Sequence, residues 1–355
     1  MLKYTKIELE LLTDFDKIAF IRAGIRGGVS QCSNRYAKAN NQYLTSYDET
    51  KCKSFLAYFD ANNLYGWAMS QYLPVGGFEW VDPDTNFNIP DTSEYGFILE
   101  VDLKYPDELH DLHSDLPLCP KNICVGNTKN IKLVPNLNNK TKYKIHYRNL
   151  KQCLKLVFGK TMENIEKRVN VKLLTHWENR NYILKKFGDK TKLLYTDTDS
   201  FIYQFFTDNL YDDLKPDLMA WFDTSNYPPD NLFGYPKINK KKLEYFKDEN
   251  NGDILEEFVG LRSKMYAFTV GEKFVAKAKG VNKSVTKKLE LGNYKSCLFN
   301  KNIQHHNMYR FRSIKHTIFT QEINKTSLSY QDTKRYILPN QIDTLAWGHY
   351  KLRKL

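Results

Sequence analysis

The sequence lacks the features that would assign it to a membrane-spanning, secreted or disulfide-linked class. It has no apolar run near the roughly 20 residues that a membrane-spanning helix needs, and residues 1–4 do not begin a signal peptide. Its six cysteines include no C-x-x-C pair. We therefore expect an intracellular protein with reduced thiols and no membrane partner. A zinc site that uses Cys119 and Cys124 is a minor alternative.

The charge balance is strongly basic. The 355 residues include 53 Lys and Arg against 41 Asp and Glu, a formal net charge of +12. Such an excess is typical of proteins that bind polyanions, because binding releases counterions. Basic residues gather in segments 237–247, 273–288 and 305–315. Lysine-rich runs are also common on solvated faces, so charge alone only supports a nucleic-acid partner.

Two carboxylates stand two positions apart in residues 195–200, YTDTDS. The mostly apolar segments KLL at 192–194 and FIYQFF at 201–206 flank them and predict the two strands of a hairpin. A tight turn would direct Asp197 and Asp199 toward one spot, where their repulsion favours a divalent cation with oxygen ligands. The alternative is an Asp-Thr-Asp turn that caps its own backbone.

Another carboxylate, Asp60, follows the apolar and aromatic segment 54–59, which predicts a buried strand. The two asparagines at 62 and 63 are typical of a turn or a helix cap, and residues 64–69 could open a helix. A carboxylate at the end of a buried strand, beside free N–H groups, can hold a metal-bound triphosphate. The simpler alternative is that Asp60 is a helix N-cap.

Together, four segments resemble the motifs of family B DNA polymerases, in the family's order. They are DANNLYG at 60–66 (motif A), VFGKTMEN at 157–164 (the end of motif B), YTDTDS at 195–200 (motif C) and SKMY at 263–266 (K-x-Y). The amino-acid sequence around motifs A, B and K-x-Y is similar to that of the protein-primed branch found in viruses, linear plasmids and Maverick/Polinton transposons. The resemblance extends from Lys6 to the C-terminus and is weak over 150–190.

This resemblance implies an α+β right-hand polymerase fold with an antiparallel palm sheet, shortened helical fingers and a small thumb. It implies template-dependent addition of dNTPs to a DNA 3′-OH by two-metal phosphoryl transfer. The implied cofactor is a pair of Mg²⁺ ions, for which Mn²⁺ can substitute. The implied partners are primer–template DNA, dNTPs and a priming terminal protein, in a nuclear or virus-associated setting.

The resemblance also implies a role for individual residues. The carboxylates of Asp60 and Asp199 would bridge the metals, the carbonyl of Ala61 would face a metal, and Asp197 would be an auxiliary catalytic carboxylate. The implied nucleotide-binding residues are Asn63, Leu64, Tyr65, Lys151, Phe158 and Gly159. The implied DNA-binding residues are Lys264, Tyr266, Lys277, Lys279, Arg26, Gly27 and Gly28.

Three of these roles have simpler alternatives. Tyr65 matches the family's steric gate against a 2′-OH, but it could also be a core aromatic. Lys264 and Tyr266 would share a strand face toward the primer, or be a solvated lysine beside a packed ring. The loop at 26–30 could be a helix C-cap and turn without a template contact.

Two departures from the family pattern bear on activity. Motif A begins at Asp60, which leaves no room for the preceding exonuclease domain, so we expect no proofreading. The fingers resemble the family's poorly, because Lys151 has the motif B spacing without its preceding helix, and Lys155 and Leu156 replace the Asn-Ser of the motif. The chain from Phe158 in motif B to Asp197 in motif C is also short for the family. A catalytically impaired nucleic-acid-binding remnant is therefore the alternative function, and a metal-dependent nuclease is a more distant one.

The predicted organisation follows the motifs along the chain. Residues 1–50 would contain an N-terminal helix (7–24) and a Gly-rich loop, and residues 51–103 would form the first part of the palm, with a strand over 95–103. An irregular insertion at 104–149 resembles the priming-protein region. It would be followed by truncated fingers at 150–190 with a helix over 160–187, a second palm part at 191–270 and a thumb at 271–355.

Overall fold

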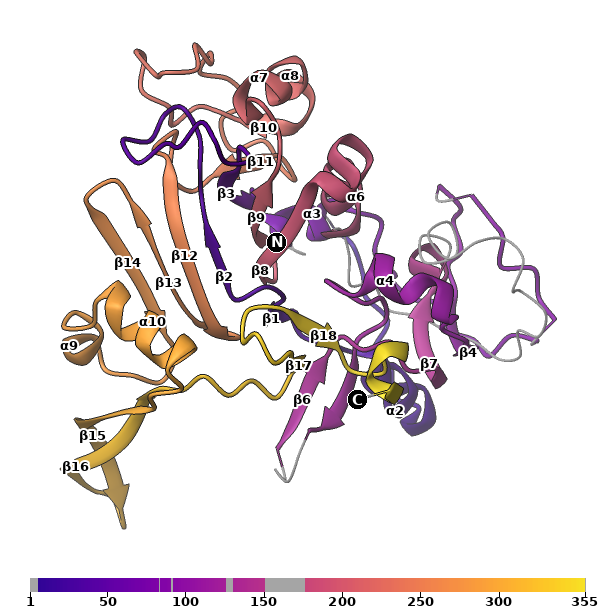
Figure 1. Ribbon diagram of the computed structural model, residues 1–355. Coiled ribbons are helices and arrows are strands. Elements are labelled where there is room, and N and C mark those ends of the chain that lie inside the picture. The colour runs from indigo at the N-terminus through magenta and orange to yellow at the C-terminus, as the bar shows by residue number, and fades with distance from the viewer. Residues whose placement is uncertain (1–5, 83, 91, 126–129, 151–175, 355) are drawn as a thin grey trace.

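The computed structural model describes residues 6–82, 84–90, 92–125, 130–150 and 176–354. Within these ranges a ten-stranded sheet forms the centre of the molecule (Figure 1). Its strands are β1 (Ser30–Cys32), β2 (Tyr36–Lys38), β3 (Phe55–Ala61), β8 (Thr191–Asp197), β9 (Ser200–Phe205), β10 (Phe222–Asp223), β11 (Phe246–Asp248), β12 (Leu255–Arg262), β13 (Met265–Val270) and β14 (Lys273–Ala278).

The main path of this sheet runs β1-β8-β9-β3-β12-β13-β14, with β2 on β12 and with β11 on β3. Every pairing is antiparallel except that of β10 with β11. The expectation of an α+β protein with mostly antiparallel sheets is therefore confirmed, and so is the hairpin predicted over 191–206.

Alternation along the central strands separates the two faces of the sheet. Phe55, Ala57 and Phe59 of β3 enter one aromatic core, whereas Leu56 enters a second core on the opposite face. Because both faces are covered, the strands appear in the sequence as nearly continuous apolar runs. The first core is completed by helices α6 (His176–Phe187) and α7 (Leu210–Leu214), and helix α10 (Leu291–Phe299) packs on β12 and β13 in a third.

The helices of the described ranges are short. They are α2 (Phe15–Gly24), α3 (Leu64–Ser70), α4 (His110–His113), α6 (His176–Phe187), α7 (Leu210–Leu214), α8 (Leu218–Trp221), α9 (Lys283–Thr286) and α10 (Leu291–Phe299), with 3₁₀ turns η1 (Asp107–Leu109), η2 (Gly188–Lys190), η3 (Lys215–Asp217) and η4 (Tyr350–Lys354). No helix of the described ranges is long and apolar enough to cross a membrane.

Four two-stranded sheets complete the described part of the chain. They pair β4 (Ile98–Leu103) with β7 (Lys140–His146), β5 (Lys121–Cys124) with β6 (Ile131–Val134), β15 (Gln304–Ile314) with β16 (Thr317–Leu328), and β17 (Arg335–Ile337) with β18 (Thr344–Ala346). The β15–β16 hairpin projects away from the rest of the molecule (Figure 1).

Three predictions about the local structure are wrong in part. The helix expected over 7–24 begins only at Phe15, because the Asp14 carboxylate caps it by accepting N–H bonds from residues 16 and 17. The strand expected over 95–103 is β4, which pairs with β7 and not with the large sheet. The insertion at 104–149 is not irregular, since it contains η1, α4 and β5–β7.

The large sheet also crosses the predicted subdivisions. Strands β1 and β2 come from the segment predicted as helix and loop, and β14 comes from the segment predicted as thumb. Helix α6 agrees with the helix expected over 160–187 as far as the described residues extend.

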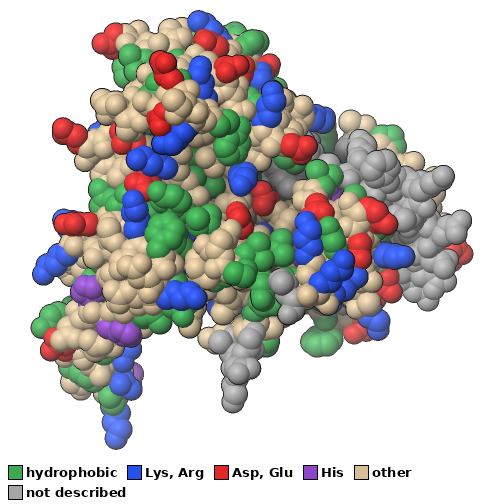
Figure 2. Space-filling model, in the orientation of Figure 1, with side chains coloured by type: hydrophobic (Ala, Val, Ile, Leu, Met, Phe, Trp, Pro, Cys, Tyr) green, Lys and Arg blue, Asp and Glu red, His purple; other side chains and the backbone are tan. Residues whose placement is uncertain are grey.

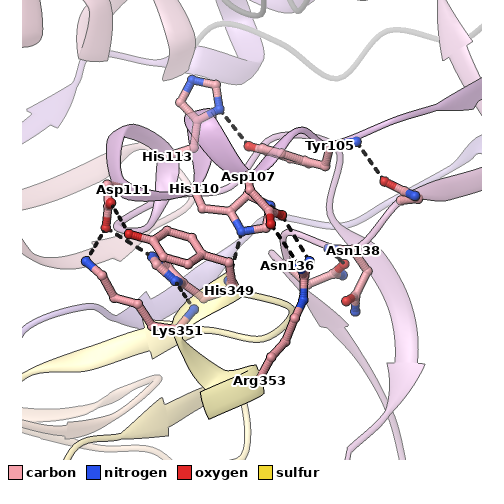
Figure 3. A network of polar contacts seen from close by, with 12 residues as sticks. Tyr105, Asp107, His110, Asp111, His113, Asn136, Asn138, His349, Lys351 and Arg353 are labelled. Carbon is pink, nitrogen blue, oxygen red and sulfur yellow. Dashed lines mark hydrogen bonds and ion pairs between the residues drawn. The ribbon is translucent and has the colours of Figure 1, made fainter. Parts of the chain in front are cut away.

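The C-terminal turn η4 is held against η1 and α4 by a network of polar contacts (Figure 3). The Arg353 guanidinium donates to both oxygens of Asp107 at 2.8 and 2.9 Å. The Asp111 carboxylate accepts from Tyr350 and Lys351 at 2.7 and 2.5 Å. Two buried histidines, His110 and His349, lie inside this network. The exposed ion pairs therefore surround two neutral imidazole rings.

These two histidines are held in defined orientations. The Nδ1 of His110 accepts the N–H of Tyr350 at 3.0 Å, and the Nδ1 of His349 accepts the N–H of Lys351 at 3.2 Å. Each Nδ1 is therefore unprotonated at neutral pH. Burial, the largest influence on both rings, lowers the pKa of His110 and of His349 below the ordinary 6.5.

The histidine pair predicts that the C-terminal network weakens in acid. Both pKa values are lowered in the folded state, so the unfolded chain binds protons more readily, and stability present above pH 6.5 is lost as the pH falls below it. We expect His349→Asn, which keeps an acceptor near Nδ1 but does not titrate, to reduce the pH dependence of Tm between pH 7.5 and 5.5 by roughly 2 °C. The matched control is His316→Asn, at the exposed tip of the β15–β16 hairpin. Equal pH profiles for wild type and His349→Asn would contradict the assignment.

Candidate functional site

Three carboxylates meet at the turn that joins β8 and β9. The register pairs Ser200 with Asp60 on one side and with Asp197 on the other. Directly paired residues point to the same face of a sheet, so Asp60, Ser200 and Asp197 form one row across three strands. Asp199 lies in the turn beside this row, and its carbonyl accepts the N–H of Ala61 at 2.9 Å.

The turn takes an unusual backbone conformation that its neighbours stabilise. Thr198 has a φ of +60°, in the left-handed region. Its N–H donates to the carbonyl of Val29 at 2.7 Å. A Cβ added to Gly28 would lie 2.1 Å from the Thr198 hydroxyl oxygen, so only glycine fits there without a shift. Gly28 of the predicted DNA-binding loop therefore supports the carboxylate turn.

The other members of that loop are placed differently. The Arg26 guanidinium lies 3.8 Å above the ring of Tyr143 and donates to the carbonyls of Gly24 and Lys144, both at 2.9 Å. These contacts give Arg26 a structural role that the sequence does not indicate. A Cβ at Gly27 would meet nothing within 4 Å, so no close approach explains glycine at this position.

The electrostatic environment of Asp60 disfavours its charge. Burial, followed by repulsion from Asp199 and Glu249, raises the pKa of Asp60 to about 7, and Lys247 opposes this shift in part. Burial is also the largest influence on Asp199, and it raises the pKa of that carboxyl too. The two groups are therefore a partly buried pair with incompletely balanced charge, which a hard cation would relieve.

Glu249 is a site residue that the sequence analysis missed. It follows β11, and its N–H donates to the carbonyl of Tyr58 on β3 at 2.9 Å, which carries it next to Asp60. Its proximity depends on the pairing of β11 with β3, two strands far apart in the chain. No local pattern around residue 249 indicates that pairing.

Asp197 differs from the other two carboxylates because its charge is balanced. The Lys264 ammonium donates to both of its oxygens at 2.7 Å. The N–H of Lys264 donates to the Tyr195 hydroxyl at 3.0 Å, and that hydroxyl is 3.1 Å from the Ser30 hydroxyl. Asp197 is therefore the anchor of Lys264 in this structure, and Asp60 and Asp199 remain as the carboxylates available to a cation.

Lys264 and Tyr266 both lie at the site, but not on one face of a strand as predicted. Lys264 has a φ of +59° and lies in the turn before β13, so the two residues do not share a strand face as expected. Tyr266 lies within the sheet, its ring 4.3 Å from that of Tyr195 and its hydroxyl 3.4 Å from that of Tyr58. The aromatic contacts and the ion pair thus join the β12–β13 turn to the β8–β9 turn.

The residues after Asp60 form the start of α3. The side chain of Asn63 accepts the N–H of Gly66 at 3.1 Å and caps the helix, and Leu64 is buried. Tyr65 is 70% exposed, so it is not the core aromatic of the simpler interpretation. It lies in the first turn of α3, five residues after Asp60 in the chain.

Two of the remaining predicted residues, Lys277 and Lys279, lie at the border of the site. Lys277 and Lys279 are exposed, Lys277 is the strand partner of Tyr266, and the N–H of Lys279 donates to the carbonyl of Lys264 at 2.9 Å. Lys151, Phe158 and Gly159 lie outside the described residues.

No known protein-family model matches this chain, and no curated protein gives a significant match. Across the described ranges, no group of three or more His, Cys, Asp or Glu side chains is arranged to hold a metal. A cation site here would therefore combine the two carboxylates of Asp60 and Asp199 with other oxygens, such as backbone carbonyls, water or a ligand's phosphates.

The raised pKa of Asp60 predicts that its charge destabilises the fold. Because the folded-state pKa is about 7 and the unfolded value is 3.8, stability is present below pH 3.8 and is lost as the pH rises through 7. At pH 8 we expect Asp60→Asn to stabilise the protein by about 1–2 kcal/mol, less than the full shift implies, because the carboxylate is partly solvated.

The same variant tests the cation. Millimolar Mg²⁺ should raise the Tm of the wild type at pH 8 and have a smaller effect on Asp60→Asn. Asp208→Asn, an exposed carboxylate beyond the other end of β9, is the matched control and should behave as the wild type in both measurements. A destabilised Asp60→Asn, or an equal response to Mg²⁺, would contradict the assignment.

Proposed function

We propose that this chain is a DNA-directed DNA polymerase, which adds dNTPs to the 3′-OH of a primer on a template by metal-assisted phosphoryl transfer. The observation that carries the proposal is the meeting of Asp60 and Asp199, two partly buried carboxylates from distant segments, at one end of the central sheet. Phosphoryl transfer between nucleotides needs such rigidly held carboxylates.

In this proposal the large antiparallel sheet is the palm of a right-hand polymerase. Residues 150–190 would be shortened fingers, and 271–355 would contain the thumb, apart from β14, which belongs to the sheet. The 104–149 insertion would contact a priming terminal protein. Lys151, Phe158 and Gly159 would contact the incoming nucleotide together with Asn63 and Leu64.

The carboxylates of Asp60 and Asp199 and the carbonyl of Ala61 would hold Mg²⁺, or Mn²⁺ in its place. When bound, the ions would lower the pKa of the attacking hydroxyl and offset the charge of the leaving pyrophosphate. The neighbouring side chains would position the substrates. The exposed ring of Tyr65 could lie under the sugar and exclude a 2′-OH, and Lys264, held in place by Asp197, could contact a primer phosphate.

The projecting hairpin supports a polyanionic partner. Lys, Arg and His side chains gather on it, as Figure 2 shows. The strand register places Arg310 and Arg312 on the same face, whereas Tyr309 and Phe311 occupy the opposite face and are 62% and 81% exposed. A ribbon with a cationic face and exposed aromatic rings suits the phosphates and bases of DNA.

The alternative is a remnant that binds nucleic acid without turnover. It is favoured by the short distance between motifs B and C in the sequence, because a lysine on a shortened segment would position a triphosphate poorly. A metal-dependent nuclease would use the same carboxylates, but it gives no reason for the exposed Tyr65 or for Lys264.

The proposal predicts that Asp199→Asn loses nucleotide addition by roughly 10³-fold or more, on the scale of removing a preorganised electrostatic group. Binding of primer–template DNA should be kept or slightly strengthened, because one negative charge near phosphate is removed. Primer extension and fluorescence anisotropy measure the two properties, with Asp208→Asn as the control.

The possible results separate the hypotheses. Extension by Asp199→Asn at the wild-type rate would overturn the polymerase proposal. A wild type that binds DNA tightly but never extends a primer would favour the remnant, and release of cleaved DNA would favour the nuclease. Equal loss of binding and extension in Asp199→Asn would indicate misfolding, which circular dichroism checks.

The hairpin gives a second prediction. Replacing Arg310 and Arg312 together by glutamine should weaken DNA binding and lower the slope of log K against log salt by about 1–2, since each lost phosphate contact removes about 0.9. The control is the double replacement of Lys51 and Lys192, exposed lysines outside the proposed fingers and thumb. An unchanged slope would remove the hairpin from the DNA interface.

A further inference from the structure

The chain returns to the edge of the large sheet shortly before its C-terminus. Arg335 is buried, and its guanidinium donates to the Thr344 hydroxyl at 2.5 Å and to the Ser114 carbonyl at 2.8 Å. These bonds hold the Arg335 side chain between β18 and the 104–149 insertion. Lys334, the preceding residue, is therefore tethered beside the sheet.

The Lys334 ammonium reaches the strand next to the carboxylate turn. Its Nζ donates to the carbonyl of Ser30 at 2.7 Å. Ser30 is the strand partner of Asp197, which in turn binds the Lys264 ammonium. Lys334 and Lys264 thus approach the same end of β8 from different segments of the chain.

A third ammonium lies beside Lys334. Lys132 of β6 donates to the Thr333 hydroxyl at 2.6 Å. The pKa of Lys334 is lowered, first by burial, and repulsion from Lys132 and Lys264 adds to this effect, while carboxylates led by Asp332 act in the opposite direction. Lys334 therefore lies close enough to both Lys132 and Lys264 for their positive charges to repel its own.

Lys264 is paired with Asp197, and Asp332 lies near Lys334, so the three ammonium groups outnumber these two carboxylates by one and can attract a further anion. Lys132 and Lys334 donate to a neutral hydroxyl and a neutral carbonyl, and an ammonium has three N–H groups, so both have donors to offer. We propose that Lys132, Lys264 and Lys334 form an anion site for one phosphodiester group of a nucleic-acid strand. The proposal rests on the function proposed above and adds a strand contact to it.

The position of this site favours the strand over the incoming nucleotide. Lys334 meets the sheet at β1, whereas Asp60 is on β3, and β8 and β9 lie between them. Three strand spacings of about 4.8 Å separate the two by roughly 14 Å. A phosphate held by Lys334 would therefore belong to the DNA backbone on the Lys264 side and not to a triphosphate at Asp60 and Asp199.

Binding of DNA with single neutral phosphates tests the site. A primer–template duplex would carry one methylphosphonate at successive primer positions, and anisotropy would give Kd for the wild type and for Lys334→Gln. We expect Lys334→Gln to weaken binding about tenfold, on the scale of one charge-assisted hydrogen bond. A methylphosphonate at one particular position should weaken DNA binding by the wild type about as much. At that position it should cause no further loss of binding by Lys334→Gln. Lys334→Arg should restore binding.

The control is Lys192→Gln, an exposed lysine at the far end of β8, which should leave Kd unchanged. The loss of binding in Lys334→Gln could instead add equally to the loss caused by each methylphosphonate, or it could accompany a fall in Tm. Either result would show a structural role for Lys334 and overturn the site. A raised KM for dNTP with unchanged DNA binding would assign it to the triphosphate and also overturn it.

Extension assays separate this inference from the proposed function. Coupling between Lys334 and one phosphate in a protein that never extends primers would leave the site intact and reject polymerase activity. Normal extension without such coupling would reject the site alone. Failure of the wild type to bind DNA would reject both.

Discussion

The register of three strands controls the position of the polar groups at the candidate site. Ser200 pairs with Asp60 on β3 and with Asp197 on β8, and the turn between β8 and β9 contains only residues 198 and 199. A slip of one residue would move Asp60 to the face that carries Phe59 and would bury a carboxylate among aromatic rings. The burial of the core and the direction of the carboxylates are therefore set by the same pairing.

Charge is distributed unequally over this row. Asp197 is neutralised by Lys264, whereas Asp60 and Asp199 repel each other in a partly buried setting that raises the pKa of Asp60 to about 7. Sites that keep such an unfavourable arrangement commonly use it for a ligand. The same electrostatic strain that costs stability in the free protein would be released when a cation binds, which links the stability of the fold to its proposed chemistry.

Contacts between distant segments hold this arrangement in place. The C-terminal segment reaches the sheet through Arg335 and Lys334, and η4 closes over the buried pair His110 and His349. Every one of these contacts joins residues more than 200 positions apart in the chain. The edge of the site is therefore formed jointly by β1 and by residues 334 and 335, which are distant from it in the chain.

The sequence by itself determined the features that depend on neighbouring residues. Apolar runs on both sides of residues 195–200 predicted the 191–206 hairpin, and the end of the buried strand placed Asp60 beside a turn and a helix. Only the tertiary structure decided the partners. In the folded protein β14 belongs to the large sheet and β4 pairs with β7. Glu249 lies next to Asp60, and Asp197 forms an ion pair with Lys264. The physical reason is that periodicity specifies which face of a strand is buried, whereas strand pairing and ion pairs depend on which distant segments pack together.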